Sequence, residues 1–154
     1  PYRLVVTGRT KHFLSAFGEH VIGEEVEASL LQAANEEHIH ITEFTVAPRI
    51  STDAGKSFHE WFIEFENKPK DIAACVRKID DNLRNRNVYY DDLIAGNILQ
   101  RLKISPIQKN GFIDYMKSIG KLGGQNKVPR LSNDRTIADG LSAFVQQQPA
   151  PAEL

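Results

Sequence analysis

The amino-acid sequence predicts an α+β fold, in which a small mixed or antiparallel sheet is flanked by helices. Residues 39–47 and 58–66 alternate apolar and polar side chains with the two-residue period of strands. Residues 24–35 and the segment after residue 69 instead carry apolar residues at helical spacing. A chain of 154 residues that is 41% hydrophobic and 25% charged is typical of one globular domain with its own core.

Short extended segments open the chain, at residues 4–7, 13–17 and 20–22. A turn at Gly18 joins the last two of them, which predicts a small β-hairpin. Residues 24–35 follow as an amphipathic helix, and the helix dipole favours its acidic first turn.

The two central strands pair through a turn at residues 51–57, and Trp61, Ile63 and Phe65 share one face of the second strand. The next helix is expected to begin near Pro69, because proline is tolerated in a first turn. The apolar stripe that lays this helix on one face of the sheet consists of Ile72, Val76, Ile79 and Leu83.

The C-terminal third alternates further helices with one strand. We expect helices at residues 87–98, 109–119 and 136–145, an edge strand at residues 99–107 and a glycine-containing loop at residues 118–130. Residues 146–154 are rich in Gln, Pro and Ala and are predicted to be a disordered tail. Neither a repeat nor a domain boundary interrupts residues 1–145, which we interpret as one domain.

Charge and cysteine usage narrow the class of protein. The net charge of -1 excludes whole-chain attraction to nucleic acid or to an anionic membrane, although residues 101–154 carry a net +4. The single Cys75 allows neither an intramolecular disulfide nor a cysteine zinc cluster, and no apolar run is long enough to span a bilayer. These features predict a cytoplasmic protein. The chain begins at Pro1, directly at an extended segment, which indicates a fragment of a longer protein.

Two local patterns suggest ligands but are better explained as structure. Gly55-Lys56-Ser57 resembles the end of a phosphate-binding loop, but that loop also needs a glycine where this chain has Ile50. A turn between strands explains the pattern. His38 and His40 could point toward a metal from one strand face, but the spacing alone is a weak signal. A partly exposed pair at a strand start explains it better, and we predict no metal site.

Two further groups could carry acid–base or nucleophilic chemistry. Cys75 lies beside alanines on a helix, so we expect it to pack rather than to act as a nucleophile. The run Tyr89-Tyr90-Asp91-Asp92 offers phenols and carboxylates, but adjacent residues of a helix point in different directions. We therefore expect a solvated and capped helix start there.

The loop at residues 120–130 is the most informative segment, because it combines three glycines with the cations Lys121, Lys127 and Arg130. A mobile loop with cations is how an enzyme lid reaches an anionic group late in a closing motion. A solvated basic turn is the alternative, and composition alone favours that turn.

Residues 8–27 resemble the hinge signature of the adenylate-forming enzymes. In that superfamily a Gly-Arg pair and a hinge residue precede a short apolar strand, a glycine turn and a helix that opens with acidic residues. The matching positions here are Arg9, Lys11, Gly18, Glu25 and Glu27. Gly23 stands where proline is usual.

Residues 87–94 and 124–131 narrow the resemblance to the bacterial branch of the Gretchen Hagen three family, the auxin-responsive promoter family of acyl acid–amido synthetases. The resemblance covers residues 1–145 and concerns only the small C-terminal lid domain of that family. Plant members usually have an aromatic residue where this chain has Asn126, so their substrate preferences are not transferred.

The resemblance implies a two-step reaction, in which a carboxylic acid and ATP give an acyl-adenylate and an amine then forms an amide. Lys127 matches the catalytic lysine of the family, Arg9 its nucleotide contact and Lys11 its hinge residue, while Lys121 and Arg130 are possible accessory cations. ATP with Mg²⁺ would be bound mainly by an N-terminal adenylation domain outside this chain. The isolated domain is therefore expected to be inactive.

Two other functions stay open at this point. A small-molecule-binding regulatory module of similar form would bind its ligand without a partner domain. A nucleic-acid binder would use the cations of residues 101–135, but aromatic side chains do not interleave with the cations of the loop.

Overall fold

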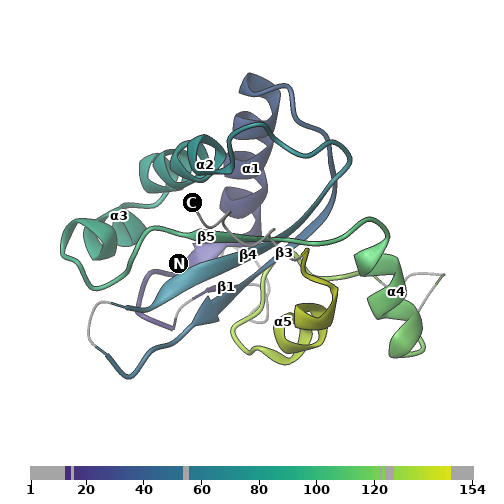
Figure 1. Ribbon diagram of the computed structural model, residues 1–154. Coiled ribbons are helices and arrows are strands. Elements are labelled where there is room, and N and C mark those ends of the chain that lie inside the picture. Colours follow the sequence, from purple (N-terminus) through teal and green to yellow (C-terminus); the bar gives the residue numbers. More distant parts are fainter. Residues whose placement is uncertain (1–12, 15, 54–55, 122, 124–126, 147–154) are drawn as a thin grey trace, which may run out of the picture.

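A three-stranded mixed sheet separates helices that lie on its two faces (Figure 1). The computed structural model describes residues 13–14, 16–53, 56–121, 123 and 127–146. The strand order is β3-β4-β5, where β4 pairs antiparallel with β3 and parallel with β5. The three strands are β3 (Ile41–Arg49), β4 (Phe58–Phe65) and β5 (Lys103–Pro106). The predicted α+β class with a small mixed sheet is confirmed.

The edge strand β5 is shorter than the sequence predicts. Only residues 103–106 form the strand, while Leu99 makes a single parallel bridge to Ser57. Pro106 lies opposite Ile63 and donates no hydrogen bond, which an edge strand tolerates better than a central one. The strand β4 lies in the centre of the sheet, and its side chains are buried on both faces.

The predicted hairpin is present as a separate two-stranded sheet. Its strands, β1 (Phe13–Leu14) and β2 (Val21–Ile22), pair antiparallel. Gly18 adopts φ +85 in the turn, a conformation that glycine enters without a steric penalty. The strand predicted at residues 4–7 lies outside the described residues.

One face of the sheet is covered by the first three helices, which enclose the larger core. They are α1 (Gly23–Glu36), α2 (Ile72–Arg86) and α3 (Val88–Ala95). Trp61 and Ile63 of β4 point into this core and Phe65 packs against it, as the strand period predicted. The start of α2 was predicted wrongly at Pro69: Asp71 caps the helix by accepting a hydrogen bond from the Ala74 N–H at 3.1 Å.

The opposite face carries the second core, beneath α4 (Gly111–Ser118), α5 (Thr136–Leu141) and the 3₁₀ turn η2 (Ser142–Phe144) (Figure 1). Phe62 of β4 points into this core, between the two residues that face the other one. The helix predicted at residues 136–145 thus ends as an α-helix at Leu141 and continues as a 3₁₀ turn. In the parts of the chain that the structure describes, no helix has both the length and the apolar character needed to cross a membrane.

A fourth extended segment, residues 130–132, lies along the free edge of β3. The Val46 N–H donates to the Arg130 carbonyl at 3.0 Å, and the Ser132 N–H donates to the Val46 carbonyl at 2.9 Å. The Thr45 hydroxyl donates to the Pro129 carbonyl at 2.7 Å. The C-terminal end of the glycine-containing loop is therefore fixed to the sheet.

Gly140→Ala is expected to destabilise the domain by about 1–3 kcal/mol, the usual cost of overpacking. An added Cβ would lie 2.5 Å from the Tyr115 ring, which is itself buried in the second core, so α5 and α4 would have to separate. Gly23→Ala is the matched control, because its Cβ would meet only the Arg130 Cβ at 3.8 Å. Urea unfolding measures both variants, and equal stabilities for them would contradict this account.

Candidate functional site

Lys127 lies at the start of the segment that is fixed to β3. Its side chain is exposed, while the next residue, Val128, is buried in the second core. Pro129 then accepts the hydrogen bond from Thr45. The backbone that carries Lys127 is thus anchored within two residues, and its ammonium group faces solvent.

Lys127 and Lys121 border a cavity of ≈ 270 Å³ beside α4. The volume is slightly below the roughly 300–1,000 Å³ that is usual for small-molecule sites, so this cavity is better suited to part of a substrate than to a whole one. The carboxylates of Glu43 and Glu64 also line it. Its remaining lining residues are Thr42, Phe112, Ile113, Met116, Gly123 and Val128.

Glu64 has a structural task at this cavity. Its buried carboxylate accepts hydrogen bonds from the backbone N–H groups of Asn110 and Phe112, at 3.3 Å and 3.2 Å. These donors belong to the N-terminal end of α4, where the helix dipole favours a negative charge. Glu64 therefore connects the central strand β4 to α4, the helix that forms one wall of the cavity.

Arg130 differs from the two lysines, because its guanidinium is held in place. It forms ion pairs with Glu43 at 2.7 Å and with Glu27 at 3.7 Å, and it lies 4.7 Å from the centre of the Phe44 ring. These contacts join the loop to β3 and to α1. The role of Arg130 as an accessory cation stays a prediction, as does that of Lys121.

Arg9 and Lys11, the predicted nucleotide contact and hinge residue, lie outside the described residues. The structure therefore does not place them relative to Lys127. The hairpin that follows them is described, and its polar contacts were not predicted from the sequence.

A buried acid–histidine pair ties the turn of this hairpin to β4. His59 Nε2 lies 2.9 Å from Glu19 Oε1, and both side chains are completely buried. The second carboxylate oxygen of Glu19 accepts a hydrogen bond from the Phe17 N–H at 2.9 Å. Burial alone would raise the pKa of Glu19, but the hydrogen bond and charge attraction of His59, with the backbone donors, hold that pKa below its usual value.

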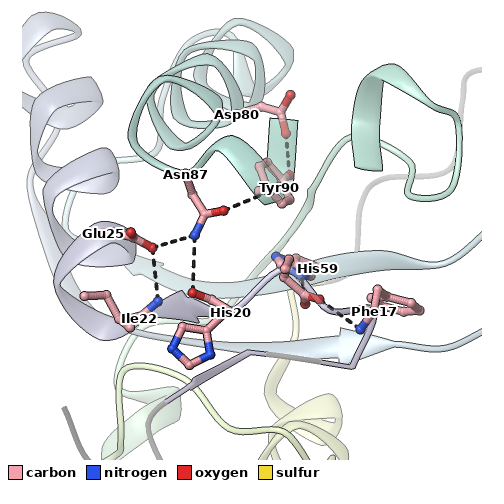
Figure 2. A network of polar contacts seen from close by, with 9 residues as sticks. Phe17, His20, Ile22, Glu25, His59, Asp80, Asn87 and Tyr90 are labelled. Carbon is pink, nitrogen blue, oxygen red and sulfur yellow. Dashed lines mark hydrogen bonds and ion pairs between the residues drawn. The ribbon is translucent and has the colours of Figure 1, made fainter. Parts of the chain in front are cut away.

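The pair continues into a second buried contact, between Tyr90 and Asp80. The ring of Tyr90 stacks on the His59 ring with centroids 5.1 Å apart, and its hydroxyl donates to Asp80 Oδ1 at 2.6 Å (Figure 2). Burial raises the pKa of Asp80, although Tyr90, the Leu102 N–H and Arg101 oppose this. Burial and the charge of Asp80 together raise the pKa of Tyr90 well above its usual value, so the phenol stays a donor.

The predicted solvated start of the helix at residues 87–98 is therefore only half right. Asn87 does cap α3, because its side-chain oxygen accepts the Tyr90 N–H at 2.8 Å, and Tyr89 is exposed. Tyr90, however, is completely buried. The helical rotation of about 100° per residue that separates the two neighbours places Tyr90 against His59.

The other candidates behave as packing or surface residues. Cys75 is buried, and burial is the main reason that its pKa is raised to about 11, which disfavours the nucleophilic thiolate. His38 and His40 are exposed, and the described residues contain no group of three or more His, Cys, Asp or Glu placed to hold a metal ion. In the turn after β3, the Ser57 hydroxyl accepts the Ser51 N–H at 2.9 Å, as a structural turn requires.

Comparison with protein families decides what the domain is. The sequence-family model for the GH3 family C-terminal domain matches residues 24–136, which is most of the chain. The chain belongs to the GH3 family. GH3 is the Gretchen Hagen three family, so the predicted family and the predicted C-terminal domain are confirmed, while the bacterial branch stays a prediction.

Solved structures agree with this GH3 assignment in fold. The domain is similar to AtGH3.15 acyl acid amido synthetase in complex with 2,4-DB, with TM-score 0.70 and 18% identity over 91% of this chain. It is also similar to a second structure of GH3.15 acyl acid amido synthetase, with TM-score 0.72 and 18% identity. This chain spans 26% of the length of either structure. A comparison with curated proteins found no match.

Tyr90→Phe is expected to lower the free energy of unfolding by about 1–3 kcal/mol, because it leaves the buried Asp80 carboxylate without its closest donor. The matched control is Tyr89→Phe on the same helix, whose hydroxyl belongs to a side chain that is 60% exposed. That control should stay within about 0.5 kcal/mol of the wild type. Urea unfolding at neutral pH measures both, and a Tyr90→Phe variant as stable as the control would show that the contact contributes nothing.

Glu19 is expected to make stability depend on acid pH. Because the folded state lowers the pKa of Glu19, its contribution is present above the unfolded value of about 4.3 and is lost as pH falls through the folded pKa. The free energy of unfolding of Glu19→Gln should therefore decrease less than that of the wild type between about pH 5 and pH 3. Glu24→Gln, an exposed carboxyl on α1, controls for the loss of one charge. Parallel curves for all three proteins would refute the assignment.

Proposed function

We propose that this GH3 domain is the mobile C-terminal lid of an ATP-dependent acyl acid–amido synthetase. In the proposed reaction a carboxylic acid and ATP give an acyl-adenylate and pyrophosphate, and an amine such as an amino acid then displaces AMP to form an amide. The observation that supports the proposal is an exposed Lys127 on an anchored backbone, in a domain of the GH3 family.

The first step explains why a lysine is needed. A carboxylate oxygen of the acid attacks the α-phosphorus of ATP, the bond to the β-phosphate breaks, and pyrophosphate leaves with the electron pair. Negative charge on the phosphate oxygens increases in the transition state, where a positioned cation stabilises it. We assign this task to Lys127, which is delivered by the domain and does not stay bound to the product.

Three features of the site support this role. The Lys127 side chain faces solvent, so it can reach a nucleotide that another domain holds. Its backbone is tied to β3 through Pro129 and Arg130, so movement of the domain moves the lysine with it. Among the described residues no carboxylate forms an ion pair with the Lys127 ammonium. Within this part of the chain, its charge is therefore available to a bound anion.

The remaining parts of the proposal concern the rest of the enzyme. An N-terminal adenylation domain would be the partner and would hold the acid, most of the ATP and Mg²⁺. Arg9 would contact the ribose or phosphate of the nucleotide, and Lys11 would be the residue whose backbone torsions absorb the rotation between the two steps. Because this chain spans 26% of the related synthetases, we propose that it is inactive alone.

Lys127→Ala in the full-length parent protein is expected to remove about 2–4 kcal/mol of transition-state stabilisation from adenylation. Pyrophosphate release with ATP and a panel of carboxylic acids measures this step. Amide formation from preformed acyl-adenylate should be affected far less. The matched control is Lys117→Ala, an exposed lysine on α4, which should release pyrophosphate as the wild type does.

Two outcomes would count against the proposal. Equal losses in both half-reactions would mean that Lys127 is structural. No acid-dependent pyrophosphate release by a folded parent protein that binds ATP would favour a regulatory module that binds a small molecule without catalysis. Tight binding of a nucleotide or an amino acid by the isolated domain, measured by calorimetry, would support that second function.

A further inference from the structure

The turn and second strand of the β1–β2 hairpin are held by four side chains, which we call the hairpin clamp: Glu19, Glu25, His59 and Asn87. Figure 2 labels the last three of them. They come from the hairpin itself, from α1, from β4 and from the junction between α2 and α3. The clamp follows the predicted hinge residue in the sequence, and three of its side chains, Glu19, His59 and Asn87, are buried.

Asn87 forms the side of the clamp nearer the helices. It separates α2 from α3 and is 5% exposed. Its side-chain N–H groups donate to Glu25 Oε2 at 3.0 Å and to the His20 carbonyl at 3.3 Å, while its oxygen accepts the Tyr90 N–H. The same Glu25 oxygen also accepts the Ile22 N–H at 3.1 Å. One amide thus contacts the hairpin, α1 and α3 together.

Glu19 and His59 form the side of the clamp nearer the sheet. The two side chains are completely buried and 2.9 Å apart, and Glu19 also accepts the Phe17 N–H. Between the two sides, His20 adopts φ +46, which is uncommon for a residue other than glycine. Its carbonyl is the one that Asn87 binds. Contacts on both sides of the turn therefore hold a backbone shape that the chain does not favour alone.

Apolar packing alone would not give the hairpin a defined orientation. Val21 is buried in the larger core and Phe17 packs against it, but apolar contacts are non-directional. Hydrogen bonds depend on distance and angle, so those of the clamp select one orientation of the hairpin relative to the sheet.

The strand β4 connects this clamp to the Lys127 site. His59 points to the face of the clamp, whereas Glu64, on the other face of the same strand, fixes α4 and lines the cavity beside Lys127. A strand in the middle of a sheet does not bend easily between these positions. The clamp and the cavity beside Lys127 therefore share one structural element, the strand β4.

We propose that Glu19 and Asn87 are positioning residues, which fix the hairpin rigidly to the domain so that rotation at the hinge carries Lys127 to a defined position. This inference rests on the proposed function. Without the clamp, part of each rotation would be absorbed between the hairpin and the sheet, and the lysine would reach the nucleotide in a range of positions.

Amide hydrogen exchange of the full-length parent protein tests the clamp without using its activity. The variants are Glu19→Ala and Asn87→Ser, the second of which keeps an oxygen to cap α3 and loses both side-chain N–H groups. Exchange of the peptides that contain Phe17 and Ile22 should become at least about tenfold faster, with β4 and α2 still protected. Glu19→Gln, which keeps the carbonyl oxygen for Phe17, should restore slow exchange.

Two exchange results would overturn the clamp. Unchanged protection of the hairpin would show that apolar packing suffices, and equal loss of protection across the whole domain would show a merely structural role. Glu24→Ala is the matched control for Glu19→Ala, because Glu24 is an exposed carboxyl on the neighbouring helix. If Glu19→Ala does not fold, Asn87→Ser alone decides.

A double-mutant cycle with Lys127→Ala tests the positioning role. Each clamp variant should slow pyrophosphate release roughly 10- to 100-fold, the cost of misplacing a reacting group by on the order of 1 Å, with the KM for ATP unchanged. In the Lys127→Ala background the same substitutions should change the rate less than about twofold, because the group that they position is gone. Equal effects in both backgrounds would overturn the proposal.

The two proposals fail in different ways. A wild-type parent protein that releases no pyrophosphate with any acid removes the proposed function and, with it, the positioning role. The exchange experiment still decides whether the clamp holds the hairpin. The parent protein could instead release pyrophosphate in a Lys127-dependent way, while the effects of the clamp substitutions simply add to that of Lys127→Ala. That result would leave the proposed function intact and would refute only the positioning role.

Discussion

The structure depends on the pairing of polar side chains that it buries. Glu19, His59, Tyr90 and Asp80 are all completely buried, and an unpaired polar group in such a place costs several times the net value of a hydrogen bond. Arrangements of the elements that would leave these side chains without their partners are therefore disfavoured. Apolar burial supplies most of the free energy that holds the layers together, but the polar pairs select the relative positions of the hairpin, the sheet and the first three helices.

The central strand β4 contacts the elements on both faces of the sheet. Its alternate residues face the two cores, with Trp61 on one side and Phe62 on the other. The polar residues of the strand follow the same alternation: His59 belongs to the buried network, while Glu60 pairs with Arg135 at 2.8 Å ahead of α5. One strand thus sets the position of elements that lie far apart in the sequence, and the site beside Lys127 takes its geometry from the strand as much as from its own loop.

Local sequence patterns predicted the positions of the helices and strands better than they predicted the contacts between them. The two-residue period located β3 and β4, and the helical stripe located α2, because both patterns arise from burial on one face. The start of α2 was missed because the Asp71 cap competes with Pro69 as a start signal. The partners of Tyr90 could not be read locally, since His59 and Asp80 meet it only after the chain folds. Lys127 was chosen by family resemblance, because no local pattern separates it from Lys121 in the same loop.

The basic side chains of residues 101–154 fall into two groups, those held in ion pairs and those left exposed. Arg130 and Arg135 are held in ion pairs with Glu43 and Glu60, where a planar guanidinium binds a carboxylate in a fixed direction. Lys127 and Lys121 keep exposed ammonium groups on long side chains beside the cavity. An arginine at the place of Lys127 would compete for the carboxylates that line the same cavity, because its planar fork binds carboxylates in two parallel hydrogen bonds. A lysine is a compact, strongly hydrated charge, which suits the transient contact with an anion that we propose for Lys127.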